Sequence, residues 1–86
     1  MVYKIIYTSL AVKSLQKMPR NTANLIREKI GQIAKDPYAP NPNALKLQGR
    51  EGYRLRIGDW RVIYEINKEE IVILVLKIAL RGEVYK

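Results

Sequence analysis

The chain has 86 residues and a formal net charge of +8, with 16 Lys and Arg against 8 Asp and Glu, so its electric field attracts polyanions such as nucleic acid or an acidic protein. A hydrophobic fraction of 48% and a charged fraction of 28% argue against disorder, and the length suits one domain that spans residues 1–86. The absence of Cys and His excludes disulfides, thiol nucleophiles, imidazole catalysis and the usual zinc ligands, and we expect no metal and no cofactor.

The N-terminal segment predicts one strand followed by a helix. Residues 2–7 are rich in β-branched and aromatic side chains, which favours a strand, and Thr8 and Ser9 after them offer a helix cap. A helix over residues 10–18 ends before Pro19. Its apolar face is expected to hold Ala11, Leu15 and Met18.

A second helix is predicted from Asn21, as its cap, to the Asp36-Pro37 stop. Its apolar residues repeat at helical spacing and predict a buried seam shared with the first helix: Ile26, Ile30, Ile33 and Ala34. The proline-rich residues 37–43 then predict a loop.

The second half of the chain predicts a three-stranded meander. Residues 53–57 and 60–66 alternate with a period of two around Gly58-Asp59, a pair suited to a type II′ hairpin turn. Residues 71–78 are almost continuously apolar and predict a strand buried on both faces. The tail after this strand is open between a helical turn and an extended segment. We therefore expect an α+β fold with an N-terminal strand and a two-helix hairpin packed on an antiparallel sheet.

The N-terminal apolar run is too short for a signal peptide, and no apolar stretch is long enough to cross a membrane. We therefore expect a soluble cytoplasmic protein that does not associate with membranes.

Three arginines of the hairpin are predicted to lie on the sheet face away from the helices. A two-residue turn places Arg56 opposite Arg61, with Arg54 on the same face. The helix-facing side would then hold Tyr53, Leu55, Ile57, Trp60, Val62, Tyr64 and Ile66. Like charges opposite one another destabilise a ladder, whereas guanidinium groups bind phosphate oxygens in pairs, so the pattern favours a polyanion site. The alternative is an ordinary solvated face with ion pairs to Glu65 and Glu83.

Four further residues are candidates for the same site. Lys46 and Arg50, just before the hairpin, extend a phosphate track, or else are ordinary surface charges. Arg81 and Tyr85 follow the apolar strand, whose end can deliver them to the arginine face. A tyrosine beside arginines stacks on an exposed base of single-stranded RNA, although Tyr85 is equally suited to covering the edge of the core.

The segment GYRLRIGDWRVIYEI at residues 52–66, followed by an apolar strand and ALRGEVYK, resembles the RelE/ParE toxin superfamily in motif, element order and length. This resemblance implies a microbial-RNase-like RelE fold and a toxin of a toxin–antitoxin system that inhibits translation. It implies a metal-independent, ribosome-dependent endoribonuclease that cuts mRNA at the A site by 2′-hydroxyl attack. By the same resemblance the catalytic residues are Arg56, Arg61, Arg81 and Tyr85, and the RNA-binding residues are Lys46, Arg50 and Arg54.

The chain departs from this pattern at two positions. Arg56 stands where relatives carry a lysine proposed as general base, and an arginine is a poor base, so we assign it to electrostatic stabilisation. Leu80 stands where many relatives have a histidine, so Arg81 is expected to stabilise the leaving group by charge and hydrogen bonding.

The resemblance also implies partners: a RelB-like antitoxin that is acidic and partly disordered, the mRNA and the ribosome, and operator DNA only through the antitoxin complex. Two alternatives stay open. One is a ParE-like inhibitor of DNA gyrase, and the other is an inactive family member that only binds antitoxin and operator.

Overall fold

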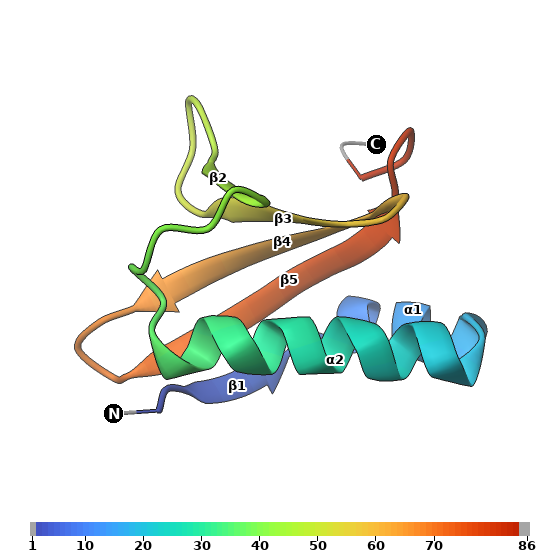
Figure 1. Ribbon diagram of the computed structural model, residues 1–86, viewed down its shortest axis with the longest axis horizontal. Coiled ribbons are helices and arrows are strands. Elements are labelled where there is room, and N and C mark those ends of the chain that lie inside the picture. Colours follow the sequence, from blue (N-terminus) through green and yellow to red (C-terminus); the bar gives the residue numbers. More distant parts are fainter. Residues whose placement is uncertain (1, 85–86) are drawn as a thin grey trace.

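The computed structural model describes residues 2–84, over which the chain forms two helices and five strands. In chain order they are β1 (Lys4–Tyr7), α1 (Ser9–Lys17), α2 (Arg20–Lys35), β2 (Ala44–Lys46), β3 (Tyr53–Ile57), β4 (Trp60–Asn67) and β5 (Val72–Leu80). The strands form one sheet in the order β1-β5-β4-β3-β2, and both helices lie on the same face of it (Figure 1). The predicted α+β class, with its helix pair and C-terminal meander, is confirmed.

The hairpin between β3 and β4 has the predicted register. Arg56 lies opposite Arg61, and Ile57 lies opposite Trp60. Gly58 has a φ of 58°, and Asp59 is not among the residues with positive φ, as a type II′ turn requires. Two-residue alternation and a glycine-first turn therefore determine which hairpin side chains face the helices.

The sheet is mixed, which differs from the antiparallel sheet expected. Strand β1 runs parallel to β5, with Lys4 opposite Val72 and Tyr7 opposite Val75. A parallel pair needs a long connection, and the two helices together with the meander supply it. The short strand β2, which the sequence did not single out, pairs antiparallel with β3.

The two helices begin in different ways. Thr8 caps α1, because its Oγ1 accepts the N–H of Ala11 at 3.2 Å. The expectation that Asn21 caps the second helix was wrong, since α2 already begins at Arg20 with Pro19 in the cap position. A proline side chain has no hydrogen-bond acceptor, so α2 starts without a side-chain cap.

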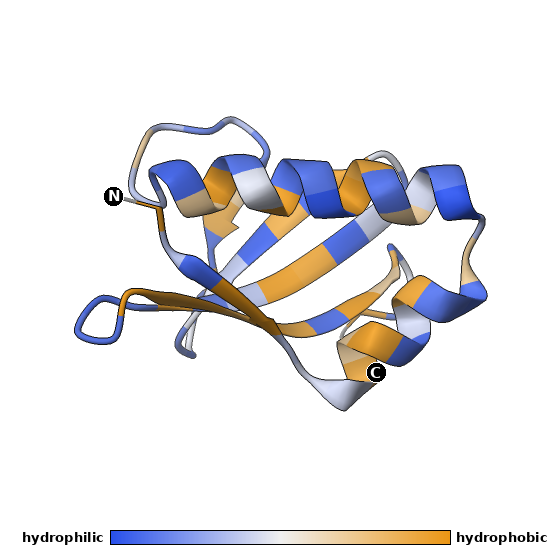
Figure 2. Cartoon of the chain, turned by 90° about the horizontal axis from the view of Figure 1, so that it is seen from below, coloured by the Kyte–Doolittle hydropathy of each residue, from blue (hydrophilic) through white to orange (hydrophobic). Residues whose placement is uncertain are grey.

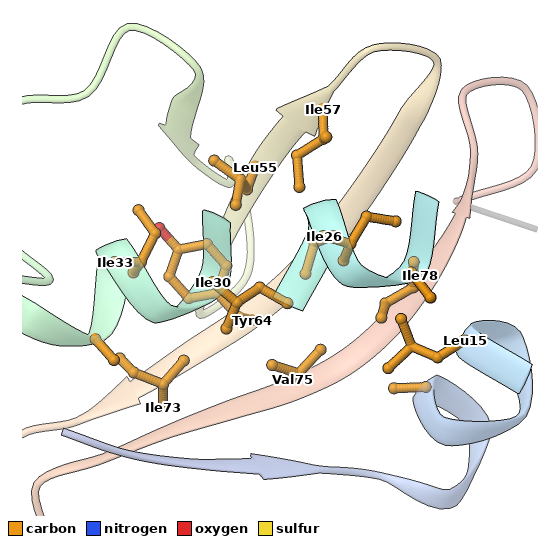
Figure 3. Packing of buried hydrophobic residues seen from close by; sticks show 14 of the residues in the cluster. Leu15, Ile26, Ile30, Ile33, Leu55, Ile57, Tyr64, Ile73, Val75 and Ile78 are labelled. Carbon is orange, nitrogen blue, oxygen red and sulfur yellow. The ribbon is translucent and has the colours of Figure 1, made fainter. Parts of the chain in front are cut away.

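The core lies between the helices and the sheet (Figure 3). The apolar helical seam predicted from the sequence is buried, as are Leu55 and Ile57 of β3. In β4 the buried residues do not alternate, since residues 61–64 are all buried. The helices contribute Ala11, Leu15, Ala23, Ile26, Ile30, Ile33 and Ala34, the link between them contributes Met18, and the sheet contributes Leu55, Ile57, Val62, Tyr64, Ile73, Val75 and Ile78. In Figure 2 the exposed face of α2 is mainly hydrophilic, whereas α1 also shows hydrophobic areas, in keeping with its exposed Leu10 and Val12.

Strand β5 is less completely covered than its apolar sequence suggests. Ile73, Val75 and Ile78 are buried toward the helices, whereas Val72 and Leu74 are only half-buried. A register shift opposite Ile63/Tyr64 of β4 explains why the buried positions skip from 75 to 78. The first two residues of the expected tail belong to β5, and residues 81–84 form turns.

No helix in residues 2–84 covers the face of the sheet opposite α1 and α2. None of the helices in that range has the length and apolar character needed to cross a bilayer.

Candidate functional site

Arg56, Arg61 and Arg81 converge at one end of the sheet, where the turn between β3 and β4 meets the end of β5. They line one open hollow of about 530 Å³. Its other lining residues are Leu25, Lys29, Asn43, Ile57, Gly58 and Asp59. The site is therefore built from four parts of the chain: α2, the loop before β2, the hairpin, and the residue after β5.

Asn43 holds Arg56 in place. Its Oδ1 accepts a hydrogen bond from Nη2 of Arg56 at 2.9 Å, and its backbone carbonyl accepts the backbone N–H of Arg56 at 2.8 Å. The N–H of Asn43 in turn donates to Oδ1 of Asn41 at 2.9 Å. These contacts orient an exposed guanidinium group that would otherwise sample many rotamers.

Arg61 folds back over the turn. Its Nη1 donates to the carbonyl oxygens of Gly58 and Trp60, both at 2.9 Å, and the residue is only 8% exposed. Over the described residues no buried side-chain nitrogen lacks a hydrogen-bond partner, so Nη2 and Nε of Arg61 reach the accessible surface. This arginine both anchors the turn and keeps donors available for an anion. The alternation of the hairpin sequence predicted that Arg61 lies on the outer face of the sheet, but it did not predict these hydrogen bonds to the turn.

Arg81 is exposed and follows directly after β5. Its backbone N–H donates to the carbonyl oxygen of Asp59 at 2.8 Å, which ties the end of β5 to the hairpin turn. Within residues 2–84, no carboxylate forms an ion pair with Arg56, Arg61 or Arg81. Of the three hairpin arginines for which an ordinary surface predicts ion pairs with Glu65 and Glu83, Arg56 and Arg61 therefore form none within the described residues.

The other residues expected at the site lie elsewhere. Lys46 and Arg54 line a separate hollow of about 230 Å³. Arg50 is exposed and lines neither hollow. Tyr85 lies outside the described residues. Leu80, which the resemblance matches to a histidine of many relatives, lines a third hollow together with Trp60 and Glu83.

Sequence reasoning missed Lys29 and Asn43. Both lie outside the hairpin motif, one on the exposed side of α2 and the other in the loop before β2. No local pattern marks them, because their place at the site follows from how α2 and β2 pack against β3. For Asn43, the one feature of the sequence that could have drawn attention to it is that asparagines recur among the prolines of residues 37–43.

The opposite end of β4 has the reverse charge. Glu65, Glu69 and Glu70 line a hollow of about 410 Å³ together with apolar residues that include Ile6 and Leu74. Among the described residues, no three His, Cys, Asp or Glu side chains are arranged to hold a metal ion. The net charge of +8 is thus unevenly distributed, and the hollow lined by the arginines is a distinct cationic site.

This hollow is suited to binding phosphate oxygens. Guanidinium groups present paired donors, keep their charge at all relevant pH values, and stabilise charge that develops on phosphate oxygens. They are poor proton donors and acceptors for the same reason. Of the residues that line the hollow, only Lys29 and Asp59 carry a side chain that readily exchanges a proton.

Residues 5–85 match the model of the family described as the ParE toxin of the type II toxin–antitoxin system, parDE. Toxin RelG from Mycobacterium tuberculosis is 26% identical over 88 residues, which cover 100% of this chain and 99% of that protein.

Two solved structures show a similar fold. One is a chain of the archaeal RelE–RelB complex from Pyrococcus horikoshii OT3, at 30% identity and a TM-score of 0.77, with 98% of this chain and 100% of that chain covered. The other is a chain of the toxin–antitoxin complex RelBE2 from Mycobacterium tuberculosis, at 21% identity and a TM-score of 0.80, with 94% of this chain and 100% of that chain covered.

Proposed function

Because the chain belongs to the ParE toxin family of type II toxin–antitoxin systems, within the RelE/ParE superfamily, we propose that it is a ribosome-dependent endoribonuclease. It cleaves mRNA in the ribosomal A site in the cytoplasm, needs no metal, and thereby stops translation. The observation that carries this proposal is the convergence of Arg56, Arg61 and Arg81 in one hollow, where none of them forms an ion pair with a carboxylate of residues 2–84.

In the proposed reaction the 2′-oxygen of a nucleotide attacks the adjacent phosphorus. The new P–O2′ bond closes a cyclic phosphate as the P–O5′ bond breaks. Arg56, held by Asn43, and the free nitrogens of Arg61 bind the non-bridging phosphate oxygens, whose negative charge grows in the transition state. Arg81 stabilises the charge that develops on the leaving oxygen.

The remaining sequence candidates bind the substrate beyond the scissile phosphate. Arg54 and Lys46, around their own hollow, and Arg50 contact neighbouring phosphates. Tyr85 stacks on a base next to the cut. The contacts of Lys46, Arg50 and Arg54 position the RNA and contribute little to the chemical step, whereas Tyr85 belongs to the catalytic residues because it holds the base beside the cut.

The proposed partner in the cell is an acidic, partly disordered RelB-type antitoxin that neutralises the toxin. The archaeal RelE with which this chain shares 30% identity was solved as a complex with RelB. Carboxylates of such a partner bind Arg56, Arg61 and Arg81, which form no ion pair within the described part of the chain. Operator DNA is reached only through that complex.

A second candidate function is inhibition of DNA gyrase, because the matching family model is that of the ParE toxin. The two functions use the basic end of the molecule differently. An endoribonuclease needs the arginines for the chemistry, whereas a gyrase inhibitor needs only a binding surface.

Primer extension on a defined mRNA in a reconstituted translation system tests the proposal, with a ribosome-free reaction beside it. Cuts at A-site codons that disappear without ribosomes are the expected result. Arg81→Ala, whose side chain is exposed, is the matched variant and should abolish the cuts without affecting the fold.

Two other outcomes would redirect the assignment. Inhibition of gyrase supercoiling with no RNA cleavage would favour the ParE-type function. Unimpaired growth when the protein is expressed without an antitoxin would favour an inactive family member that only binds antitoxin and operator.

A further inference from the structure

We propose that Lys29 is the general acid of the reaction and protonates the leaving 5′-oxygen. This inference rests on the proposed endoribonuclease function and adds a proton donor on α2 to a site whose arginines come from the hairpin and from the residue after β5. It answers a chemical need, because the chain has no histidine and its other cationic groups in the hollow are arginines.

Lys29 sits on a rigid support. The next residue, Ile30, is 2% exposed, and Ile26 of the preceding turn is fully buried, so this part of α2 is fixed against the sheet. Leu25 lies one helical turn before Lys29 and lines the same hollow, which shows that this side of the helix faces the arginines. The lysine is held at the site by packing within the core rather than by a mobile loop.

The Lys29 ammonium group is also available. Residues three and four positions away on α2 are Leu25, Ile26, Gln32 and Ile33, so no carboxylate lies at helical pairing distance. Within the described chain it forms no ion pair. This exposed ammonium group has no anionic partner within the described residues and lines the same hollow as the three arginines, so it can donate its proton to an oxygen that departs there.

The proton balance is complete. As the P–O2′ bond forms, the 2′-hydroxyl proton passes to water. As the P–O5′ bond breaks, the 5′-oxygen takes a proton from Nζ of Lys29, which later recovers one from water. An ammonium group is protonated at neutral pH and releases its proton more readily than a guanidinium group does. Arg81 therefore acts by charge, while Lys29 supplies the proton.

The test uses two synthetic mRNAs on programmed ribosomes. One has the natural 5′-oxygen at the scissile phosphate, and the other has a bridging 5′-sulfur, which leaves without protonation. Lys29→Arg keeps the positive charge but is a much weaker acid. We expect it to cleave the oxygen substrate about 100-fold more slowly than the wild type, in the range of general acid catalysis. On the sulfur substrate we expect the wild-type rate.

Two variants serve as controls. Lys35→Arg, also on α2 but not lining the hollow, should match the wild type on both substrates. Arg56→Ala should be slow on both, because it loses phosphate binding rather than proton donation. Urea unfolding of each variant checks that the fold is intact.

The inference is overturned if Lys29→Arg cleaves the oxygen substrate at the wild-type rate, or if it is equally slow on both substrates, since the lysine would then act only through charge or position. Failure of the wild-type protein to cleave either mRNA would instead overturn the endoribonuclease function itself.

Discussion

Replacing Arg61 by alanine should destabilise the fold, although the side chain lies outside the helix-facing core. The substitution removes two hydrogen bonds from a charged donor to the carbonyl oxygens of Gly58 and Trp60. Hydrogen bonds to charged groups contribute about 1.5–3 kcal/mol each when both partners are buried. Water reaches the carbonyls at this exposed turn after truncation, which reduces the cost.

Relief of the repulsion between Arg61 and Arg56, which lie directly opposite each other, offsets a further part of the loss. We therefore expect Arg61→Ala to lower the free energy of unfolding by about 2 kcal/mol. For a chain of this size the dependence on urea is about 1 kcal/mol per molar, so the unfolding midpoint should fall by about 2 M.

The assay is urea unfolding followed by tryptophan fluorescence. Trp60 is the only tryptophan of the chain, is half-buried, and precedes Arg61 at the turn. Arg81→Ala is the comparison, because its side chain is exposed and only its backbone is hydrogen-bonded, so its midpoint should change by less than about 0.5 M. If the urea midpoint of Arg61→Ala also changed by less than about 0.5 M, the proposed role of Arg61 in anchoring the turn would be refuted.

Three further predictions follow from contacts elsewhere in the fold. Asn43→Ala should slow RNA cleavage about tenfold, or about 1.4 kcal/mol in the barrier, because Arg56 loses its fixed orientation; single-turnover cleavage on ribosomes measures this. Gly52→Ala should lower the urea midpoint far more than Gly49→Ala, since both have positive φ but only at Gly52 would the new Cβ lie 2.9 Å from the carbonyl oxygen of Tyr64. Burial, with a smaller effect from Tyr53, raises the pKa of Tyr64 from 10.0 to about 12. Above pH 10 the unfolded chain therefore loses the phenol proton before the folded chain does, and the free energy of unfolding falls toward pH 12. Between pH 9 and pH 11 the urea midpoint should therefore fall more for the wild type than for Tyr64→Phe. An equal fall for the two proteins would argue against a raised pKa of Tyr64.

The hairpin could be predicted from the sequence because its determinants are local. Strict alternation and a glycine-first turn are enough to set the register, and with it the face on which Arg56 and Arg61 lie. The buried faces of the two helices could be predicted as well. Leu15 in α1 and Ile26 in α2 each belong to a set of apolar residues that repeats at helical spacing.

What the sequence did not reveal depends on packing between distant segments. The parallel partner of β1 is more than sixty residues away along the chain, and nothing in residues 4–7 indicates the direction of that pairing. Lys29 and Asn43 reach the arginines only because α2 and the loop before β2 are held against β3. The position of Arg61 depends on backbone carbonyls of its own turn, which no pattern of side chains encodes.

The pairing of the first strand with the last has a consequence for the synthesis of the protein. Strand β5 lies between β1 and the remaining strands, so the sheet cannot close until residues 72–80 have left the ribosome. Until then β1 has no hydrogen-bonding partner, and Arg81 cannot join the turn to which its backbone is bonded. The complete sheet and the hollow lined by the three arginines therefore form only after the last strand has been synthesised.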